Sequence, residues 1–377
     1  MNFLVIPDKF KNSIAAEGVN KAITEGLNHC FSDAHIFSIL ASDGGDGFLN
    51  AVEHHLTLDK FFGTTVNPLG KKITTYFLYD SPNETAYIEL AKASGIELLS
   101  TEELDVLKAS TLGTGYQIKE AIRLGAKKIF IGLGGSATND AGIGMASALG
   151  YRFLDAYKKE VHPSGKNLAR IEEIVSDKVV PNLNEVSFFA VNDVTNPLYG
   201  PNGAAFIYAK QKGATDKTIT LLDEGLEKFS KVVTAFSGSD YSELEGAGAA
   251  GGCAFGLKVF CKAKFIRGVD FLFDLAKVPE LLREHAMDYI ITGEGKIDHQ
   301  TLHGKLIKGI LDLGTKNSIP VIAVCGVSEL SNEKVKEVGF AQMLQIHDER
   351  MPIAYSMENA SKLIADKVHD YFNNFAQ

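Results

Sequence analysis

The sequence predicts an α/β protein in which both ends of the chain build one parallel sheet and the middle forms a second, inserted domain. Three observations predict this. Apolar runs typical of strands alternate with segments of helical spacing, a pattern typical of α/β folds. The simple alternation occurs near both ends, whereas the middle is irregular and begins with a hairpin-like pair of strands. The length of 377 residues fits two domains of ordinary size.

The composition is that of an ordinary globular protein and excludes several classes. Hydrophobic residues make up 45% and charged residues 23% of the chain, which excludes a mostly disordered chain. The net charge of −9 argues against nucleic-acid binding by a broad basic surface. A membrane span is not expected, because no run of about 18 apolar residues occurs. The first residues lack a basic flank and indicate a strand rather than a signal peptide, so we expect a cytoplasmic protein.

The first elements follow from local patterns. Residues 2–6 form a short apolar strand, and residues 14–28 have helical spacing with Ser13 as a suitable N-cap. A second strand is predicted over residues 36–40. It ends at the polar, glycine-rich segment 42–47.

The middle of the chain contains both antiparallel and parallel patterns. Residues 72–79 and 84–90 are strand-like runs joined by the turn residues 80–83, which predicts a hairpin. The further elements expected here are a helix at 115–124, a strand at 128–132, a helix after the loop 134–140 and a strand at 186–191.

The simple alternating pattern returns from about residue 288. The elements expected there are strands at 289–291, 320–324 and 341–346 and helices at 304–315 and 357–373. We therefore predict one discontinuous domain from residues 1–70 plus 286–377, and an inserted α/β domain from residues 71–285.

The segment 131–144 carries the strongest chemical pattern. It follows a strand and precedes a helix, and Gly134 and Gly135 let a ligand approach the backbone closely. Hydroxyl and amide groups follow in Ser136, Thr138 and Asn139, and the N-terminus of the next helix favours anions. Phosphate is the expected ligand, although a tight strand-to-helix turn explains the glycines equally well. The segment is not a Walker A loop and does not match GxGxxG closely.

Two other segments are rich in small residues. They are residues 246–252 and residues 111–115, the second of which opens a helix. For either segment alone, close packing is a sufficient explanation. Three such loops in one domain favour a polyanionic ligand such as ATP, because each can direct backbone amides at a phosphate.

Carboxylates follow several predicted strands, where they face a crevice ligand. These residues are Asp43, Asp46, Asp193 and Asp298. They could hold Mg²⁺ or accept a hydroxyl proton, although a single such aspartate is more commonly a loop cap. Lys9 and Lys11 follow the first strand, where solvated surface lysines are the alternative interpretation. His299 and His303 have a spacing that can bind metal, but without an HExxH motif we favour helix capping or substrate contact.

Taken together and in this order, the segments resemble the bacterial glycerate kinase family, type I. The resemblance runs from residue 3 to about residue 330. Its most specific parts are residues 134–140 and 292–305. The other segments that carry it are residues 6–13, 42–47, 132–144, 193–203, 211–214 and 246–252.

The resemblance implies an ATP-dependent enzyme that phosphorylates D-glycerate with Mg²⁺, by in-line transfer in a cleft between two domains. It implies a flavodoxin-like (Rossmann-like) domain from both chain ends and a distinct α/β domain between them. Formation of 2-phosphoglycerate is favoured over 3-phosphoglycerate, and a monomer and a homodimer both stay open. Many relatives have Ser, Gly and Glu where this chain has Lys9, Asn12 and Asp46, so the preference among related hydroxy acids is open.

On this resemblance we assign three groups of site residues. The catalytic residues are Asp193, Lys11 and Asp8. The substrate-binding residues are Lys9, Ser13, Asp43, Asp46, Glu294, Asp298 and His303. The ATP-binding residues are Gly113, Thr114, Gly134, Gly135, Ser136, Thr138, Asn139, Gly248, Gly251 and Gly252. Asp193 is preferred as the base or the carboxylate that organises Mg²⁺, with Asp8, Asp43 and Asp298 as alternatives; Lys11 is preferred to neutralise the glycerate carboxylate or the migrating phosphoryl group.

Two other functions have a basis in the sequence. Residues 44–47 read Gly-Gly-Asp-Gly and also resemble the GGDG loop of NAD and lipid kinases. A sensor that keeps the fold and binds a ligand without turnover is the second alternative. The retained lysines and aspartates argue against such a sensor.

Overall fold

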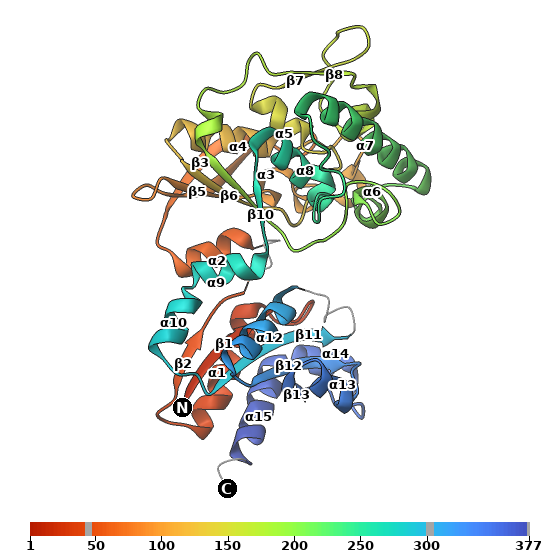
Figure 1. Ribbon diagram of the computed structural model, residues 1–377. Coiled ribbons are helices and arrows are strands. Elements are labelled where there is room, and N and C mark those ends of the chain that lie inside the picture. Colours follow the sequence, from red (N-terminus) through yellow and green to blue (C-terminus); the bar gives the residue numbers. More distant parts are fainter. Residues whose placement is uncertain (42–46, 299–304, 375–377) are drawn as a thin grey trace. The chain divides into compact units, whose positions relative to one another are not determined.

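The computed structural model contains two compact units, each with its own sheet (Figure 1). It describes residues 1–41, 47–298 and 305–374. Unit 1 comprises Met1–Asp43 with Gly268–Gln377, and unit 2 comprises Gly44–Arg267. The predicted α/β class is confirmed, with the parallel sheet of unit 1 built from both chain ends. Within the described residues, no helix combines the length and the apolar character that crossing a membrane requires.

Unit 1 contains a five-stranded parallel sheet with the strand order β13-β12-β11-β1-β2. The strands are β1 (Asn2–Pro7), β2 (His35–Ser38), β11 (Tyr289–Ile297), β12 (Val321–Ser328) and β13 (Phe340–Gln345). Counted within unit 1 from the β2 edge, this is the order 2-1-3-4-5 of flavodoxin-like sheets. The strand order reverses between β1 and β11, so the loop after β1 borders the crevice where such sheets bind ligands.

Helices cover both faces of this sheet. They are α1 (Ala16–Cys30), α9 (Gly268–Leu275), α10 (Val278–Glu284), α12 (Lys305–Asn317), α13 (Asn332–Glu337), α14 (Ile353–Glu358) and α15 (Ala360–Asn373). Phe3 and Val5 join a buried cluster with α1 and α15, which lie side by side in Figure 1. Leu4 and Ile6 join a second cluster with α9 and α12. Because alternate residues of a strand face opposite sides, burial on both faces explains the continuous apolar run of β1.

Unit 2 contains a six-stranded mixed sheet with the order β10-β9-β6-β5-β4-β3, and a small pair β7-β8. Its strands are β3 (Asp59–Val66), β4 (Lys72–Asp80), β5 (Thr85–Glu89), β6 (Lys128–Gly132), β7 (Arg152–Leu154), β8 (Glu173–Val175), β9 (Ser187–Val191) and β10 (Lys264–Ile266). Its α-helices are α2 (Phe48–His55), α3 (Ala91–Ser94), α4 (Leu112–Arg123), α5 (Ile143–Ala148), α6 (Ala204–Tyr208), α7 (Asp216–Ser237) and α8 (Ala249–Cys261). β4 and β5 pair antiparallel, so the predicted hairpin is confirmed, whereas β5, β6, β9 and β10 run parallel.

The contacts divide the chain at 43/44 and 267/268, whereas the sequence pattern predicted divisions at 70/71 and 285/286. β3 pairs along its whole length with β4, so the residues just before 70 belong to the sheet of unit 2. Near the other division, Val269 and Leu272 of α9 are buried in a core of unit 1. The first difference arises from the pairing of β3 with the strand that follows it, and the second from the packing of α9 on a core formed by segments distant in sequence.

Helix α1 begins later than predicted, and Ser13 is not its N-cap. The N-cap is Ala15, which makes no side-chain capping hydrogen bond. Ser13 Oγ instead donates to the backbone oxygen of Met357 at 2.6 Å. The prediction was wrong because this acceptor is 344 residues away in sequence, beyond any local capping pattern.

Candidate functional site

The predicted nucleotide loop and Asp193 follow neighbouring strands at one edge of the unit 2 sheet. In the register of β5, β6, β9 and β10, Glu89 lies beside Gly132, Gly132 beside Val191, and Val191 beside Ile266. The carboxyl ends of parallel strands share one edge, where ligands commonly bind. The loops after β6 and β9 therefore start as neighbours at this edge.

The loop after β6, residues 133–140, is held by backbone hydrogen bonds to the chain that follows β5. Ala137 N donates to Ser94 O at 2.9 Å, and Ile96 N donates to Gly135 O at 2.8 Å. Gly135 has a φ of +66°, in the left-handed region that glycine adopts without steric cost. The turn itself therefore favours glycine at this position, with or without a ligand.

A buried carboxylate, Asp140, closes this loop. Its Oδ2 accepts hydrogen bonds from Thr111 N (2.8 Å), Thr111 Oγ1 (2.9 Å) and Gly144 N (3.2 Å), and its Oδ1 accepts one from Gly142 N (3.1 Å). Thr111 and Gly142 are the N-caps of α4 and α5, so one carboxylate satisfies the first turns of two helices. Burial raises the pKa of Asp140, although the hydrogen bonds it accepts lower it. The anion at these helix N-termini is a side chain, whereas the sequence pattern suggested phosphate at the second of them.

Lys212 is buried against the same loop. Its side chain is 2% exposed, and its Nζ donates to Ser136 Oγ and to Thr138 O, both at 2.7 Å. No other lysine or arginine of the described chain is buried. Burial lowers the pKa of Lys212 to about 7, although the charge of Asp140 raises it. Burial therefore favours the neutral form of Lys212 far more than in a surface lysine.

The stability of the protein is expected to depend on pH through Lys212, whose pKa falls from 10.5 to about 7 on folding. Between these values the unfolded chain holds a proton that the folded protein has released. The free energy of unfolding should therefore rise with pH across this window, by up to about 1.4 kcal/mol per pH unit. This gain in stability should be lost again as the pH falls towards 7. Urea unfolding of the wild type and of Lys212→Met at about pH 7 and about pH 9 measures this. If the free energies of unfolding of the wild type and the variant differ by the same amount at both pH values, the expected role of Lys212 is contradicted.

Thr138 and Asn139 carry buried polar atoms that have no hydrogen-bond partner among the described residues. These atoms are Thr138 Oγ1, Asn139 Oδ1 and Asn139 Nδ2, and both residues are 0% exposed. An unsatisfied buried polar group costs about 1–3 kcal/mol. Such groups are uncommon and call for a ligand, a water molecule or another specific explanation. The loop thus keeps polar groups that the fold itself does not use.

The glycine-rich segment after residue 245 packs against this loop. Residues 250–252, inside α8, all have φ between 53° and 83°. A Cβ on Gly251 would lie 2.0 Å from Thr138 O, and one on Gly248 would lie 2.4 Å from Pro197 O. Both positions need glycine because protein backbone fills the space. The assignment of Gly248, Gly251 and Gly252 to ATP binding stays a prediction.

Gly113 and Thr114, also assigned to ATP, are buried in unit 2. A Cβ on Gly113 would lie 2.0 Å from Val66 O. The hydroxyls of Thr114 and Ser94 are hydrogen-bonded at 2.7 Å. Both predicted residues thus have packing or hydrogen-bonding partners within the protein, and their role towards ATP stays a prediction.

Two carboxylates lie at the carboxyl edge of the unit 2 sheet. Asp193 is two residues past the end of β9 and is 9% exposed. Glu89, the last residue of β5, is 3% exposed, and its Oε2 accepts a hydrogen bond from Leu49 N in the first turn of α2 at 3.0 Å. The sequence did not single out Glu89 as a site residue, because it lies within a strand-like run. Its place at the end of that run was the available clue.

In unit 1, the loop after β1 crosses the carboxyl end of β11. The predicted site residues on it are Asp8, Lys9, Lys11 and Ser13. Asp8 N donates to Gly293 O at 2.8 Å, and Phe10 N donates to Ile14 O at 2.9 Å, which closes a short turn. Asn12 inside this turn has a φ of +62°, a conformation that asparagine tolerates better than most residues.

A pocket of about 390 Å³ lies beside this loop. Its polar lining residues are Lys9, Lys11, Ser13, Glu294, Lys296 and Ser356. Its apolar lining side chains are Phe10, Val327, Ile346, Ile353, Met357 and Ala360. Four residues predicted as catalytic or substrate-binding thus line one pocket at the point where the strand order of the sheet reverses: Lys9, Lys11, Ser13 and Glu294.

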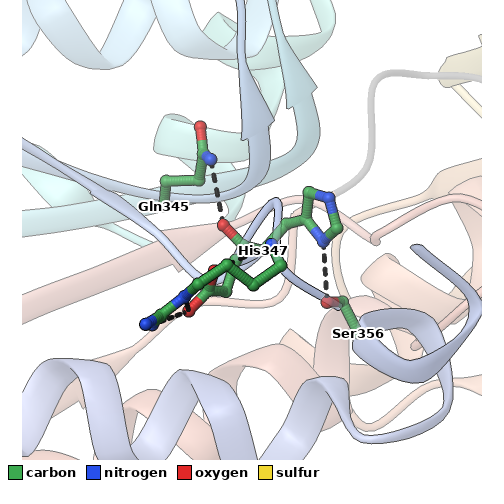
Figure 2. Close-up of polar contacts among 5 residues, drawn as sticks. Gln345, His347 and Ser356 are labelled. Carbon is green, nitrogen blue, oxygen red and sulfur yellow. Dashed lines mark hydrogen bonds and ion pairs between the residues drawn. The ribbon is translucent and has the colours of Figure 1, made fainter. Parts of the chain in front are cut away.

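A group of hydrogen bonds supports the pocket wall to which Ile346, just past β13, and α14 contribute (Figure 2). Gln345 Nε2 donates to His347 O at 3.0 Å, and Gln345 Oε1 accepts from Ser328 N at 2.9 Å. His347 Nδ1 and Ser356 Oγ are 3.0 Å apart. Ser356 is 5% exposed and lines the pocket, so His347 orients a hydroxyl group at the pocket wall.

Asp298, predicted to bind substrate, takes part in an ion-pair group. Lys296 Nζ lies 3.2 Å from Asp298 Oδ2 and 2.8 Å from Glu329 Oε1. Hydrogen bonds with Glu329 and Asp298 raise the pKa of Lys296. The predicted contact of Asp298 with substrate stays a prediction.

Three predicted substrate-binding residues, Asp43, Asp46 and His303, lie outside the described residues, as do His299 and most of the Gly-Gly-Asp-Gly segment. Their roles stay predictions. In the part of the chain that the structure describes, no three histidine, cysteine, aspartate or glutamate side chains come together as a metal site.

Comparisons with known proteins point to one family. A sequence model of the Glycerate kinase family matches residues 3–375. A glycerate kinase from Halalkalibacterium halodurans is 35% identical over 365 residues, which cover 97% of this chain and 96% of that protein. Glycerate 2-kinase from Escherichia coli K12 is 36% identical over 326 residues, or 86% and 85% of the two chains. A crystal structure of a Salmonella typhimurium LT2 protein described as glycerate kinase 2 has a TM-score of 0.84 at 31% identity, covering 100% of this chain and 98% of that one.

Proposed function

Because the chain belongs to the glycerate kinase family, we propose that it transfers the γ-phosphoryl group of ATP to a hydroxyl group of D-glycerate. One observation carries the assignment of roles: the 133–140 loop and Asp193 follow the neighbouring strands β6 and β9 at one edge of the sheet. A phosphate-binding loop beside a carboxylate is an arrangement that suits phosphoryl transfer. We expect the reaction in the cytoplasm.

The nucleotide phosphates are assigned to the 133–140 loop. The buried polar atoms of Thr138 and Asn139 have no hydrogen-bond partner among the described residues, and the Ser136 hydroxyl is held in place by Lys212. The residues assigned to ATP are Gly113, Thr114, Gly134, Gly135, Ser136, Thr138, Asn139, Gly248, Gly251 and Gly252. Of these, Gly113, Gly248 and Gly251 act by letting chain segments pack closely, since a Cβ on each would meet backbone.

D-Glycerate is assigned to the pocket in unit 1. Lys9 and Lys11 are exposed and line it, and an ammonium group there neutralises the glycerate carboxylate. Ser13 and Glu294 supply a hydroxyl and a carboxylate for the two hydroxyl groups of the substrate. The apolar residues of the pocket limit access of water to the bound acid.

The transfer is in-line. The attacking hydroxyl oxygen forms a bond to the γ-phosphorus while the bond from phosphorus to the bridging oxygen breaks and ADP leaves. The hydroxyl proton passes to a carboxylate, for which Asp193 is preferred and Asp8 and Asp298 are the alternatives among the described residues. Positioning and charge stabilisation supply most of the catalysis. The 2-hydroxyl is the proposed acceptor, so the product is 2-phosphoglycerate.

Mg²⁺ fits this site as part of the nucleotide complex. The ion commonly uses one or two protein carboxylates together with substrate phosphates, so the carboxylate of Asp193, just past β9, is a suitable ligand. When bound, the ion would neutralise charge on the phosphoryl oxygens.

An ADP-release assay with alternative acceptors tests the proposal. The purified chain is supplied with Mg·ATP and with D-glycerate, NAD or diacylglycerol. ADP formation that depends on D-glycerate is the expected result, whereas dependence on either other acceptor would favour the GGDG kinases. ATP binding without turnover on any acceptor would favour a sensor. Phosphorus NMR of the product distinguishes 2-phosphoglycerate from 3-phosphoglycerate.

Replacing Lys11 by methionine is expected to raise KM for D-glycerate by about 10- to 100-fold, the equivalent of one charged hydrogen bond. Methionine keeps much of the side-chain length but carries no charge for the substrate carboxylate. KM for ATP should change little, because ATP is assigned to unit 2. Lys21→Met, at an exposed position of α1, is the matched control. Unchanged kcat/KM for D-glycerate in Lys11→Met would remove Lys11 from the acceptor site.

A further inference from the structure

Lys212 connects a short 3-10 helix, Lys210–Lys212, to the nucleotide loop. Its Nζ donates to Ser136 Oγ and to Thr138 O at 2.7 Å, from a side chain that is 2% exposed. Gly213 follows with a φ of +90°, and a Cβ there would lie 2.7 Å from a backbone oxygen. The backbone that presents Lys212 is therefore closely packed, and its side chain reaches the loop from a fixed position.

A buried ammonium group is an unfavourable way to hold a loop. Removing the charge from water destabilises the protonated form, and burial lowers the pKa of Lys212 to about 7. Apolar residues of similar volume often replace buried charges without loss of stability. The two hydrogen bonds use two of the three Nζ protons. These facts indicate a role for the charge itself.

The loop residues that Lys212 contacts supply a second, independent observation. Thr138 gives its backbone oxygen to Lys212, while its buried hydroxyl has no partner among the described residues. The next residue, Asn139, has both side-chain polar atoms buried without a partner in the same part of the chain. Buried donors and acceptors that the fold leaves unused point to a ligand.

We propose that Lys212 is a positioning residue for nucleotide binding, which holds Ser136 and Thr138 in place and stabilises, by its charge, the phosphates of a nucleoside triphosphate on the 133–140 loop. The inference rests on the proposed function, which assigns the phosphates to this loop. The ammonium group acts through the loop, because its own hydrogen bonds go to Ser136 and Thr138. Bound phosphates, being negative, favour the protonated form of Lys212 in return.

Proton uptake on nucleotide binding tests the role of the charge. Wild-type protein should take up a fraction of a proton when it binds Mg·ADP at about pH 8, because the phosphates raise the protonated fraction of Lys212. Calorimetric titration in two buffers of different ionisation enthalpy measures this uptake. Binding of Mg·ADP by wild-type protein with no proton uptake overturns the proposal. This measurement does not depend on whether a variant folds.

Two variants separate the charge from the hydrogen bonds. Lys212→Gln can still donate to Ser136 or Thr138 without a charge, whereas Lys212→Met removes both properties. Each is expected to bind Mg·ADP about tenfold more weakly or worse, and to bind it without the proton uptake of the wild type. Lys210→Met, at an exposed position of the same 3-10 helix, should bind like the wild type. Wild-type affinity and proton uptake in Lys212→Gln would overturn the role of the charge.

The failure of this inference and the failure of the proposed function have different signatures. Mg·ADP binding is measured without D-glycerate and does not require catalysis. A protein that binds Mg·ADP in a Lys212-dependent way but phosphorylates no D-glycerate retains the inference and refutes the function. A protein that phosphorylates D-glycerate, and whose Lys212 variants bind the nucleotide normally, supports the function and refutes the inference.

Discussion

Replacing Asp193 by asparagine should lower kcat for D-glycerate phosphorylation by about 10²-fold or more, the range found for positioned acid–base groups. Asparagine has nearly the same shape, but it carries no charge and is not a base. Asp193 lies two residues past β9, the strand that pairs with β6, and the loop assigned to the ATP phosphates follows β6. KM for ATP should change far less than kcat if the carboxylate acts mainly on the transferring group. Steady-state ADP release measures both constants.

The matched control is Asp216→Asn, the same substitution at an exposed position in the first turn of α7. It should leave turnover close to that of the wild type. Near-normal turnover in Asp193→Asn would refute the assignment and move the search for the base to Asp8 and Asp298, and to Asp43 outside the described residues.

The largest loss of stability is expected from Asp140→Asn. Four donors point at this buried carboxylate, from Thr111 N, Thr111 Oγ1, Gly142 N and Gly144 N. An amide group replaces one acceptor oxygen by an NH₂ that faces donors, so at least one buried hydrogen bond is lost and the charge with it. We expect the free energy of unfolding to fall by about 3 kcal/mol or more. Urea unfolding of the full chain, monitored by circular dichroism, measures the change.

Thr111 offers a milder pair of variants for the case that Asp140→Asn does not fold. Its hydroxyl donates to Asp140 at 2.9 Å and accepts from Met145 N at 2.9 Å, and the residue is 0% exposed. Thr111→Ser keeps both hydrogen bonds, whereas Thr111→Val removes them at similar volume. Valine should destabilise the protein by about 1–3 kcal/mol more than serine does. Equal stability of the two variants would show that this network contributes little.

The sequence was most informative where the physical cause of a structure is local. The predicted strand at 128–132 coincides with β6, and the predicted turn at 80–83 joins β4 to β5. Both depend on short patterns: an apolar run, and turn residues that favour reversal of the chain. The domain divisions differed because β3 is defined by pairing with β4 and α9 by packing on a distant core.

The glycine-rich segments show what a sequence alone leaves ambiguous. A glycine marks a place where something approaches the backbone closely, but the approaching group can be a ligand or another part of the chain. At Gly251 it is Thr138 O, and at Gly113 it is Val66 O. The environment of Lys212 is likewise not evident from the sequence alone. Its position in the polar run Lys210–Lys212 suggests exposure, and the packing of a distant segment buries it.

The interrupted order of unit 1 has a consequence for its synthesis. β1 has two neighbours, β2 and β11, and residues 289–297 of β11 are made about 250 residues after β2. At about 5–20 residues per second, ribosomes need roughly 10–50 s to cover that distance. All residues of unit 2 are made before β11, so most of that unit is available to fold while one edge of β1 still lacks its partner. The nascent chain therefore exposes one unpaired edge of an apolar strand for most of its time on the ribosome.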